Sequence, residues 1–177
     1  MQEIAMTILD IVYNSIRAKA SLIKILIKDS IKDNVIDILV EDDGCGMDEE
    51  AIRHVIDPFY TTRTTRKVGL GVPLFKQMVE DTGGQFHIES KVGIGTKIQG
   101  CFVKNHLDTP PMGDIIETMM TLLQADESID YYFEYTTDEN SFIFDTKQIK
   151  EVLDGVKINE PEILLWLKNY MKEGLNQ

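Results

Sequence analysis

The order of the elements expected from this sequence places it in the α+β class. An amphipathic helix at the N-terminus is followed by two strand-like runs, further helical pattern and two more strand-like runs, and the remainder again alternates helical and strand-like segments. The chain has 177 residues, which is ample for a hydrophobic core, and its two cysteines exclude a small disulfide-stapled scaffold. We therefore expect a globular α+β protein with reduced cysteines.

The first helix is predicted from apolar residues that recur at helical spacing and reach to about Ala18. These residues are Ile4, Ile8, Ile11, Val12 and Ile16. On the same helix Asp10, Asn14 and Arg17 stand at i, i+4 and i+7, so their side chains share one face. Taken alone, such a stripe is typical of a solvated helix surface.

Two strands are expected next, at Leu22–Lys28 and Val35–Asp42, with a turn at residues 32–34. Period-two alternation in the second strand puts the Asp42 carboxylate on the same face as Ile38 and Val40, toward the core. A buried polar group without a partner costs about 2–7 kcal/mol, so Asp42 is expected to meet a hydrogen-bond donor.

Asp42 is followed by a glycine-containing segment, Asp43-Gly44-Cys45-Gly46. Its glycines permit positive φ angles and the close approach of a ligand to the backbone. A tight turn capped by Asp43 is the alternative interpretation, because this pattern by itself has low specificity.

A second glycine pair, in Gly69-Leu70-Gly71, opens a helical pattern that ends at Gly83-Gly84, ahead of strands expected at Gln85–Ser90 and Thr96–Lys104. The N-terminus of a helix offers backbone N–H groups to phosphate. Three cations, Arg63, Arg66 and Lys67, precede it and can neutralise a triphosphate. A polar loop without a ligand is the alternative.

The charge is distributed unevenly along the chain. The net charge is −12, of which residues 1–104 carry −2 and residues 105–177 carry −10. Such acidity disfavours nucleic acid and anionic membrane surfaces as partners. With no signal-peptide pattern and no apolar run of spanning length, the sequence predicts a cytoplasmic protein without membrane association.

The change in charge coincides with a polar stretch at 105–111 that ends in two prolines, which we interpret as a linker. It divides the chain into an expected domain at 1–104 and a small acidic α+β domain at 112–177. In the latter we expect a helix over residues 112–124, a hairpin from Ile129–Tyr135 and Ser141–Asp145, and a short helix at Gln148–Leu153.

A last helix is expected from near Asn159, with Glu162 at capping-box spacing. The apolar faces of this acidic segment exceed what one hairpin can cover. Three positions are open to them: against residues 1–104, against a second copy of the chain in a homodimer, or against a partner protein.

Five motifs in the first segment become specific through their order. They are Asp10-Ile11-Val12-Tyr13-Asn14-Ser15-Ile16-Arg17, Asp42-Asp43-Gly44-Cys45-Gly46, Asp57-Pro58-Phe59-Tyr60-Thr61-Thr62, Gly69-Leu70-Gly71 and Gly93-Ile94-Gly95-Thr96. In this order they resemble the N, G1, F, G2 and G3 boxes of the GHKL ATP-binding superfamily. The resemblance covers about residues 1–103, and the Pro-Phe-Tyr-Thr-Thr stretch is most similar to the catalytic domain of sensor histidine kinases.

The resemblance implies a Bergerat fold, a two-layer α/β sandwich with a mixed sheet and helices on one face. ATP would lie between helices, beneath a lid formed by the segment between the F and G2 boxes. At the adenine end, Asp42 would accept from the amino group of the base, Gly44 and Gly46 would let the backbone approach it, and Thr96 would support it.

At the phosphate end, the resemblance implies that Asn14 ligates Mg²⁺ and that Arg17 contacts a phosphate. Gly69, Leu70 and Gly71 would present backbone N–H groups to the phosphates, and the cationic lid residues Arg63 and Lys67 would lie nearby. ATP and Mg²⁺ are thus the expected cofactors.

Two residues depart from the family pattern. Hydrolysing members generally carry Glu at the position of Asp10, which is one methylene shorter; a displacement of about 1 Å can cost about 10²-fold in rate, so slow turnover is expected. Lys67 stands where kinases generally have the first glycine of the G2 box, which predicts a stiffer and more cationic lid.

The sequence contains no phosphoacceptor signature of the histidine-kinase type. His54, His87 and His106 lie in a short helix, a strand and the linker, and none of them matches an acceptor helix. We therefore expect any phosphoryl acceptor to belong to a partner protein. Three functions remain open: phosphotransfer with a partner, a non-catalytic ATP-controlled binding module, and a serine/threonine kinase of the anti-sigma-factor kind.

Overall fold

The computed structural model describes residues 2–59 and 70–176. Within these ranges the chain forms a six-stranded mixed sheet with strand order β3-β4-β2-β1-β5-β6. The strands are β1 (Leu22–Ser30), β2 (Val35–Asp42), β3 (Gln85–Lys91), β4 (Gly95–Val103), β5 (Asp130–Thr137) and β6 (Ser141–Asp145). Strands β1 and β5 run parallel, and the other neighbouring pairs are antiparallel.

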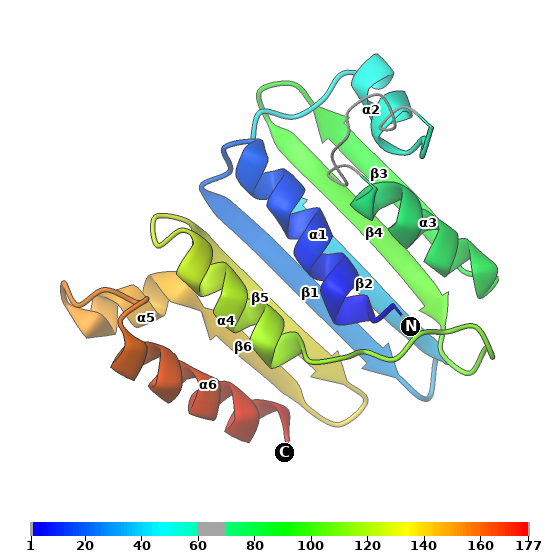
Figure 1. The fold of residues 1–177 in the computed structure, drawn as a ribbon. Coiled ribbons are helices and arrows are strands. Elements are labelled where there is room, and N and C mark those ends of the chain that lie inside the picture. Colours follow the sequence, from blue (N-terminus) through cyan, green and yellow to red (C-terminus); the bar gives the residue numbers. More distant parts are fainter. Residues whose placement is uncertain (1, 60–69, 177) are drawn as a thin grey trace.

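The longer helices lie on one face of this sheet (Figure 1). They are α1 (Ile4–Arg17), α3 (Gly71–Asp81), α4 (Ile115–Ala125) and α6 (Pro161–Leu175), with α1 between α3 and α4, and α4 between α1 and α6. The short helices α2 (Glu49–Val55) and α5 (Thr146–Leu153) lie at the periphery. The α+β class and the two-layer arrangement expected from the sequence are confirmed. No helix in the described part of the chain is long and apolar enough to span a membrane.

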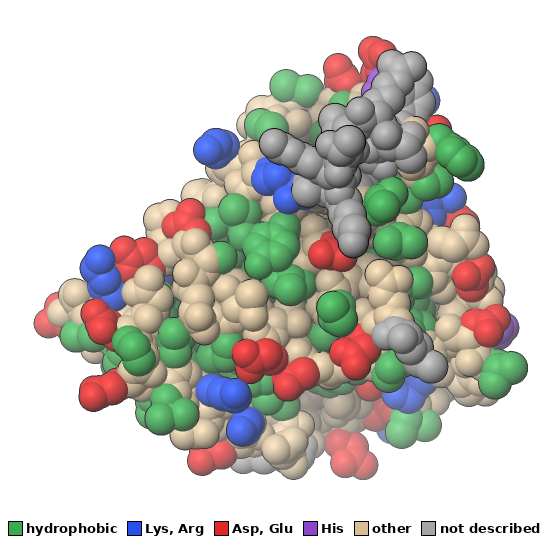
Figure 2. All heavy atoms as spheres, in the orientation of Figure 1, with side chains coloured by type: hydrophobic (Ala, Val, Ile, Leu, Met, Phe, Trp, Pro, Cys, Tyr) green, Lys and Arg blue, Asp and Glu red, His purple; other side chains and the backbone are tan. Residues whose placement is uncertain are grey.

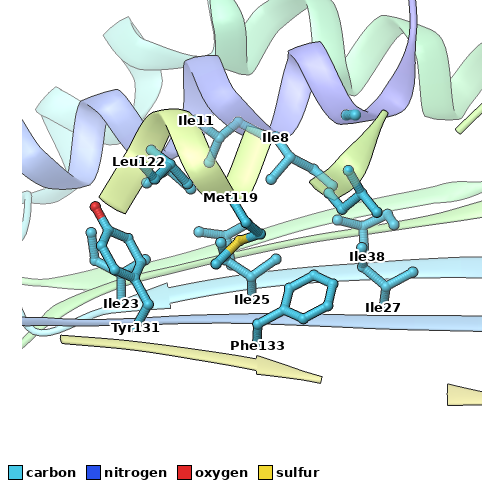
Figure 3. Packing of buried hydrophobic residues seen from close by; sticks show 14 of the residues in the cluster. Ile8, Ile11, Ile23, Ile25, Ile27, Ile38, Met119, Leu122, Tyr131 and Phe133 are labelled. Atoms are coloured by element: carbon cyan, nitrogen blue, oxygen red, sulfur yellow. The ribbon is translucent and has the colours of Figure 1, made fainter. Parts of the chain in front are cut away.

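The core fills the space between the sheet and the helices (Figure 3). In β1, alternation buries Ile23, Ile25 and Ile27 on the helix-bearing face, each at most 2% exposed. They face Ile8 and Ile11 of α1. Residues from the acidic segment complete the same core, namely Met119 and Leu122 of α4 and Tyr131 and Phe133 of β5.

Residues 112–177 thus extend the sheet of residues 1–104, whereas the sequence predicts a small domain of their own there. Strand β5 pairs in parallel with β1 from Leu22 opposite Asp130 to Asp29 opposite Thr137. The two-proline stretch is an irregular connection within the fold. Together with the residue that follows it, this stretch also caps α1, because the carbonyls of Pro111 and Met112 accept from N–H groups in the first turn, at 3.0 and 2.8 Å. The apolar residues of α4 and β5 thus pack against residues 1–104, which is the first of the three positions that the sequence leaves open.

Candidate nucleotide-binding site

The polar stripe of α1 faces the start of α3. A Cβ atom on Gly71 would lie 2.9 Å from the Cβ atom of Asp10, so the two helices touch at this point. One turn farther along α1, the Arg17 guanidinium donates to Oδ1 of Asn14. Partial burial raises the pKa of the Asp10 carboxyl, and the positive charge of Arg17 acts in the opposite direction. The stripe therefore presents a carboxylate with increased basicity and an amide oxygen beside a cation.

Asp42 ends β2 with both carboxylate oxygens hydrogen-bonded. The hydroxyl of Ser15 donates to Oδ2 at 2.6 Å, and the backbone N–H of Gly44 donates to Oδ1 at 2.8 Å. The donor expected for Asp42 thus exists within the protein, and it includes Ser15, which our sequence reasoning did not single out. The sequence does contain a signal for it: Ser15 follows Ile8 by seven residues and Ile11 by four, so it lies within the apolar stripe of α1 and faces the core.

The loop after β2 is held closely against its surroundings. A Cβ atom on Gly46, whose φ is +71°, would lie 1.9 Å from the carbonyl oxygen of Lys91, so only glycine fits there. The N–H of Cys45 donates to the carbonyl of Ala18 at 2.9 Å, and its carbonyl accepts from Gly93 at 2.7 Å. The loop therefore joins the end of α1 to the turn between β3 and β4.

Asp43 has a structural role beside this loop. Its carboxylate accepts from the hydroxyl and N–H of Ser21 and from the N–H of Leu22, at 2.6 to 2.9 Å. Partial burial raises the pKa of the Asp43 carboxyl. These hydrogen bonds outweigh it and hold the pKa below its usual value. Asp43 thus holds the connection between α1 and β1 in place. This role goes beyond the turn cap that the sequence offers as the alternative interpretation.

Thr96 lies directly opposite Asp42 on the neighbouring strand β4. Its hydroxyl is 2.7 Å from that of Ser90 on β3, and the Ser90 hydroxyl also accepts from the N–H of Met47 at 2.8 Å. Ser90 is a second residue that sequence reasoning missed, because a lone serine in a strand carries no distinctive signal. The two hydroxyls connect the glycine loop to the strands beneath it.

The start of α3 has the properties of an anion-binding helix terminus. Leu70 occupies the N-cap position without a side-chain cap, and the first turn contains no acidic residue. Gly71 is buried at the contact with α1. Arg63, Lys67 and Gly69, which we also expect at the phosphates, lie outside the described residues.

Residues present at this end of the sheet fit Mg²⁺–ATP. The Asn14 amide supplies a hard oxygen ligand beside Asp10, and Mg²⁺ usually completes its shell with phosphate oxygens and water. No group of three His, Cys, Asp or Glu side chains able to hold a metal occurs in the described ranges. The glycines at 44, 46 and 71 keep the backbone close to Ala18, Lys91 and Asp10, where a larger side chain would collide.

A cavity of about 450 Å³ borders Asp42 and Thr96 from the other side of the sheet. Much of its wall comes from Lys24, Glu41 and Lys97, which pair across the strands on the helix-free face. Because this cavity does not lie between α1 and α3, ATP is not assigned to it.

The surface around the helices shows mixed charge. In Figure 2, acidic side chains are scattered over the helix-bearing face, with basic ones singly or in small groups between them, among the side chains that the structure describes. This distribution does not favour a polyanion track.

Comparison with known proteins agrees with the geometry. A family model described as "Histidine kinase-, DNA gyrase B-, and HSP90-like ATPase" matches residues 2–107. A putative sensor protein of Shewanella frigidimarina is 27% identical over 103 residues, which are 57% of this chain and 16% of that protein. The sensor histidine kinase YvrG of Bacillus subtilis is 39% identical over 75 residues, which are 40% of this chain and 13% of that protein. The chain thus spans only a small part of these relatives.

A solved structure extends the likeness beyond the matched residues. The MutL ATPase domain of Aquifex aeolicus, in complex with ADP, superposes with a TM-score of 0.54 at 13% identity, covering 87% of this chain and 70% of that one. Residues 2–107 alone cannot account for that coverage, so part of the acidic segment also has a counterpart in that fold. The chain belongs to the family of histidine kinase-, DNA gyrase B- and HSP90-like ATPases, the GHKL superfamily, and resembles the ATPase domain of histidine kinases.

Proposed function

We propose that this chain binds ATP with Mg²⁺ at the end of the sheet where α1, β2, β4 and α3 meet, and that it regulates a separate partner protein through that nucleotide. The observation that carries the proposal is the direct contact between these elements. The hydroxyl of Ser15 bonds to Asp42, Asp42 stands opposite Thr96, and Gly71 touches Asp10.

Each of these groups has chemistry suited to one part of the nucleotide. The Asp42 carboxylate can accept from the exocyclic amino group of adenine while retaining its bond from Ser15. The start of α3 offers N–H groups to the phosphates. When bound, Mg²⁺ would neutralise phosphate charge; Asn14 would hold it through Oδ1, which requires the Arg17 guanidinium to leave that oxygen.

Calorimetric titration with Mg²⁺–ATP tests the binding site. Asp42→Asn should abolish measurable binding, because it replaces one acceptor oxygen with a donor facing the adenine amino group. Asp37→Asn is the matched control: Asp37 lies on the same strand, but its carboxylate bonds to Gln99 at 3.0 Å on the helix-free face. Unchanged affinity in Asp42→Asn would refute the site.

Phosphotransfer to a partner is the catalytic form of this proposal. Asp10 is placed beside the start of α3, and its raised pKa makes it a better proton acceptor than an ordinary aspartate. Incubation with γ-labelled ATP and co-purified partners should move label to a partner side chain or to inorganic phosphate. Phosphoserine on the partner would identify a serine/threonine kinase, and label that stays entirely on ATP would exclude catalysis.

A non-catalytic ATP-controlled switch is the second candidate, and the short side chain of Asp10 favours it. In this form ATP changes the affinity for a partner without being consumed. A ligand shifts only those states that it binds with different affinity, so partner capture must differ with and without ATP. Equal partner affinity under both conditions would contradict the switch.

A further inference from the structure

The two edges of the sheet differ in how they are protected against pairing with another strand. The β3 edge carries the exposed polar side chains Gln85, His87, Glu89 and Lys91. Charged side chains at alternate positions of an edge discourage intermolecular pairing. The β6 edge instead contains the apolar run Phe142-Ile143-Phe144, without lysine or proline.

The outward-facing hydrogen-bonding groups of β6 follow from its pairing with β5. The N–H of Thr137 donates to the carbonyl of Asn140 at 2.8 Å, which makes these two residues a hydrogen-bonded pair. Antiparallel pairs alternate, so Phe142 and Phe144 bond to β5. The N–H and C=O groups of Ser141, Ile143 and Asp145 therefore point away from the sheet.

A groove lined by both polar and apolar side chains runs along this same edge. Its volume is about 240 Å³, and Asp145 and Gln148 supply its polar lining. The apolar lining comes from β6, α5 and α6: Ile143, Ile149, Val152, Trp166 and Tyr170. Trp166 and Tyr170 stack with a centroid distance of 6.2 Å, and they remain 52% and 42% exposed. Val152 is 79% exposed and Ile143 is 47% exposed. An exposed strand edge beside a groove with exposed apolar side chains indicates a docking surface.

We propose that a second copy of this chain occupies this edge, with the two β6 strands antiparallel across a two-fold axis at Ile143. In this register each Ile143 N–H donates to the Ile143 carbonyl of the other copy. Ser141 then stands opposite Asp145, so a hydroxyl meets a carboxylate and no like charges face each other. The sheet becomes continuous through both copies.

Charge complementarity beyond the strands supports a second copy as the occupant. The same register brings Glu139 of the other copy's hairpin turn to the start of α5, where Lys147 is exposed. Glu139 is also exposed. The two-fold axis forms this opposite-charge pair twice, which specifies the register as well as the partner.

The area is adequate for self-association. An aromatic side chain presents about 150–250 Å², so Trp166 and Tyr170 at half exposure offer about 100 Å² each. With Ile143, Val152 and the strand backbone, each copy contributes roughly 500 Å², near the ~1,000 Å² total of a specific interface. We expect a dimer that dissociates in the micromolar range.

Sedimentation velocity over a concentration series tests the dimer with the full chain. Ile143→Pro removes the outward N–H and the exposed Ile143 side chain but no hydrogen bond to β5, and we expect it to weaken dimerisation at least about tenfold. Lys147→Glu should also weaken it by placing two carboxylates together, and the double variant Lys147→Glu with Glu139→Lys should restore it. Lys91→Glu, at the opposite edge, is the matched control and should leave the dimer unchanged.

A wild-type chain that stays monomeric at all concentrations would overturn the proposal. So would a dimer that tolerates both Ile143→Pro and Lys147→Glu, because the copies would then meet through another face. If circular dichroism shows that Ile143→Pro has unfolded, the two exposed charge variants decide the result. Failure of the double variant to recover the dimer would exclude the proposed register.

Discussion

Replacing Ser15 with alanine isolates the contact that joins α1 to the expected adenine residue. The Ser15 hydroxyl is buried, at 3% residue exposure, and donates to Oδ2 of Asp42 at 2.6 Å. Alanine leaves the helix and its packing unchanged but removes this donor. Among the described residues, Asp42 then keeps the hydrogen bond from the N–H of Gly44, on its other oxygen.

The expected loss follows from the character of this bond. A hydrogen bond to a charged group contributes about 1.5–3 kcal/mol to stability. Because Asp42 is half-buried, water can replace part of the contact, so the lower half of that range, about 1.5–2 kcal/mol, applies. For a chain of this size each kcal/mol corresponds to about 2–4 °C, which gives a fall in melting temperature of about 3–8 °C.

Urea and thermal unfolding followed by far-UV circular dichroism measure this loss. The double variant Ser15→Ala with Asp42→Asn completes a cycle, and we expect the two substitutions to couple by more than about 1 kcal/mol. Additive effects, or a loss below about 0.5 kcal/mol for Ser15→Ala, would refute the bond as the anchor of Asp42.

Three further substitutions test other features. Gly46→Ala should lower the free energy of unfolding by more than the ~1–2 kcal/mol of a left-handed residue, because its Cβ would lie 1.9 Å from the Lys91 carbonyl oxygen. Gly83→Ala, at φ +77° with nothing within 4 Å, is the control for strain alone, and equal losses would contradict the clash. The folded-state pKa of Asp10 lies above its ordinary 3.8, so stability falls as pH rises from 3.8 through the folded-state pKa and the carboxyl ionises. Asp10→Asn should therefore raise the free energy of unfolding at neutral pH, and this gain should vanish in acid. Urea midpoints of variant and wild type that differ by the same amount at neutral and at acidic pH would contradict this expectation. Tyr131→Phe removes a hydroxyl that is fully buried and has no hydrogen-bond partner within the described ranges, and should stabilise by about 1 kcal/mol in urea unfolding; destabilisation would indicate a concealed partner.

The site was predictable where a motif is local in sequence. Period-two alternation predicts Asp42 on the core side, and helical spacing predicts that Asp10, Asn14 and Arg17 share one face. The Ser15 donor was not predicted, because it depends on the rotation of α1 over β2, which only packing determines. How ATP and Mg²⁺ contact these residues remains a prediction.

The acidic segment shows where local signals are insufficient. The hairpin was predicted close to its observed bounds, but its pairing with β1 is a long-range contact that no local pattern encodes. The capping box at Asn159 and Glu162 is wrong: α6 begins at Pro161, whose fixed φ suits a first helical position, and Glu160 precedes it without a side-chain cap. Helix α5 begins two residues earlier than expected because Asp145 caps it through the N–H of Lys147.

The parallel pairing of β1 with β5 has a consequence for the order of folding. Strand β1 meets β2 across a short turn, whereas its contacts with the β5–β6 hairpin join residues as far as 108 positions apart. Closing such a loop must precede any gain from the contact, so non-local parallel strands assemble slowly. During synthesis, the first four strands and α1 are complete before β5 emerges, and the isoleucine-rich edge of β1 is open in that interval. The nascent chain is therefore exposed to aggregation until β5 emerges and covers this edge.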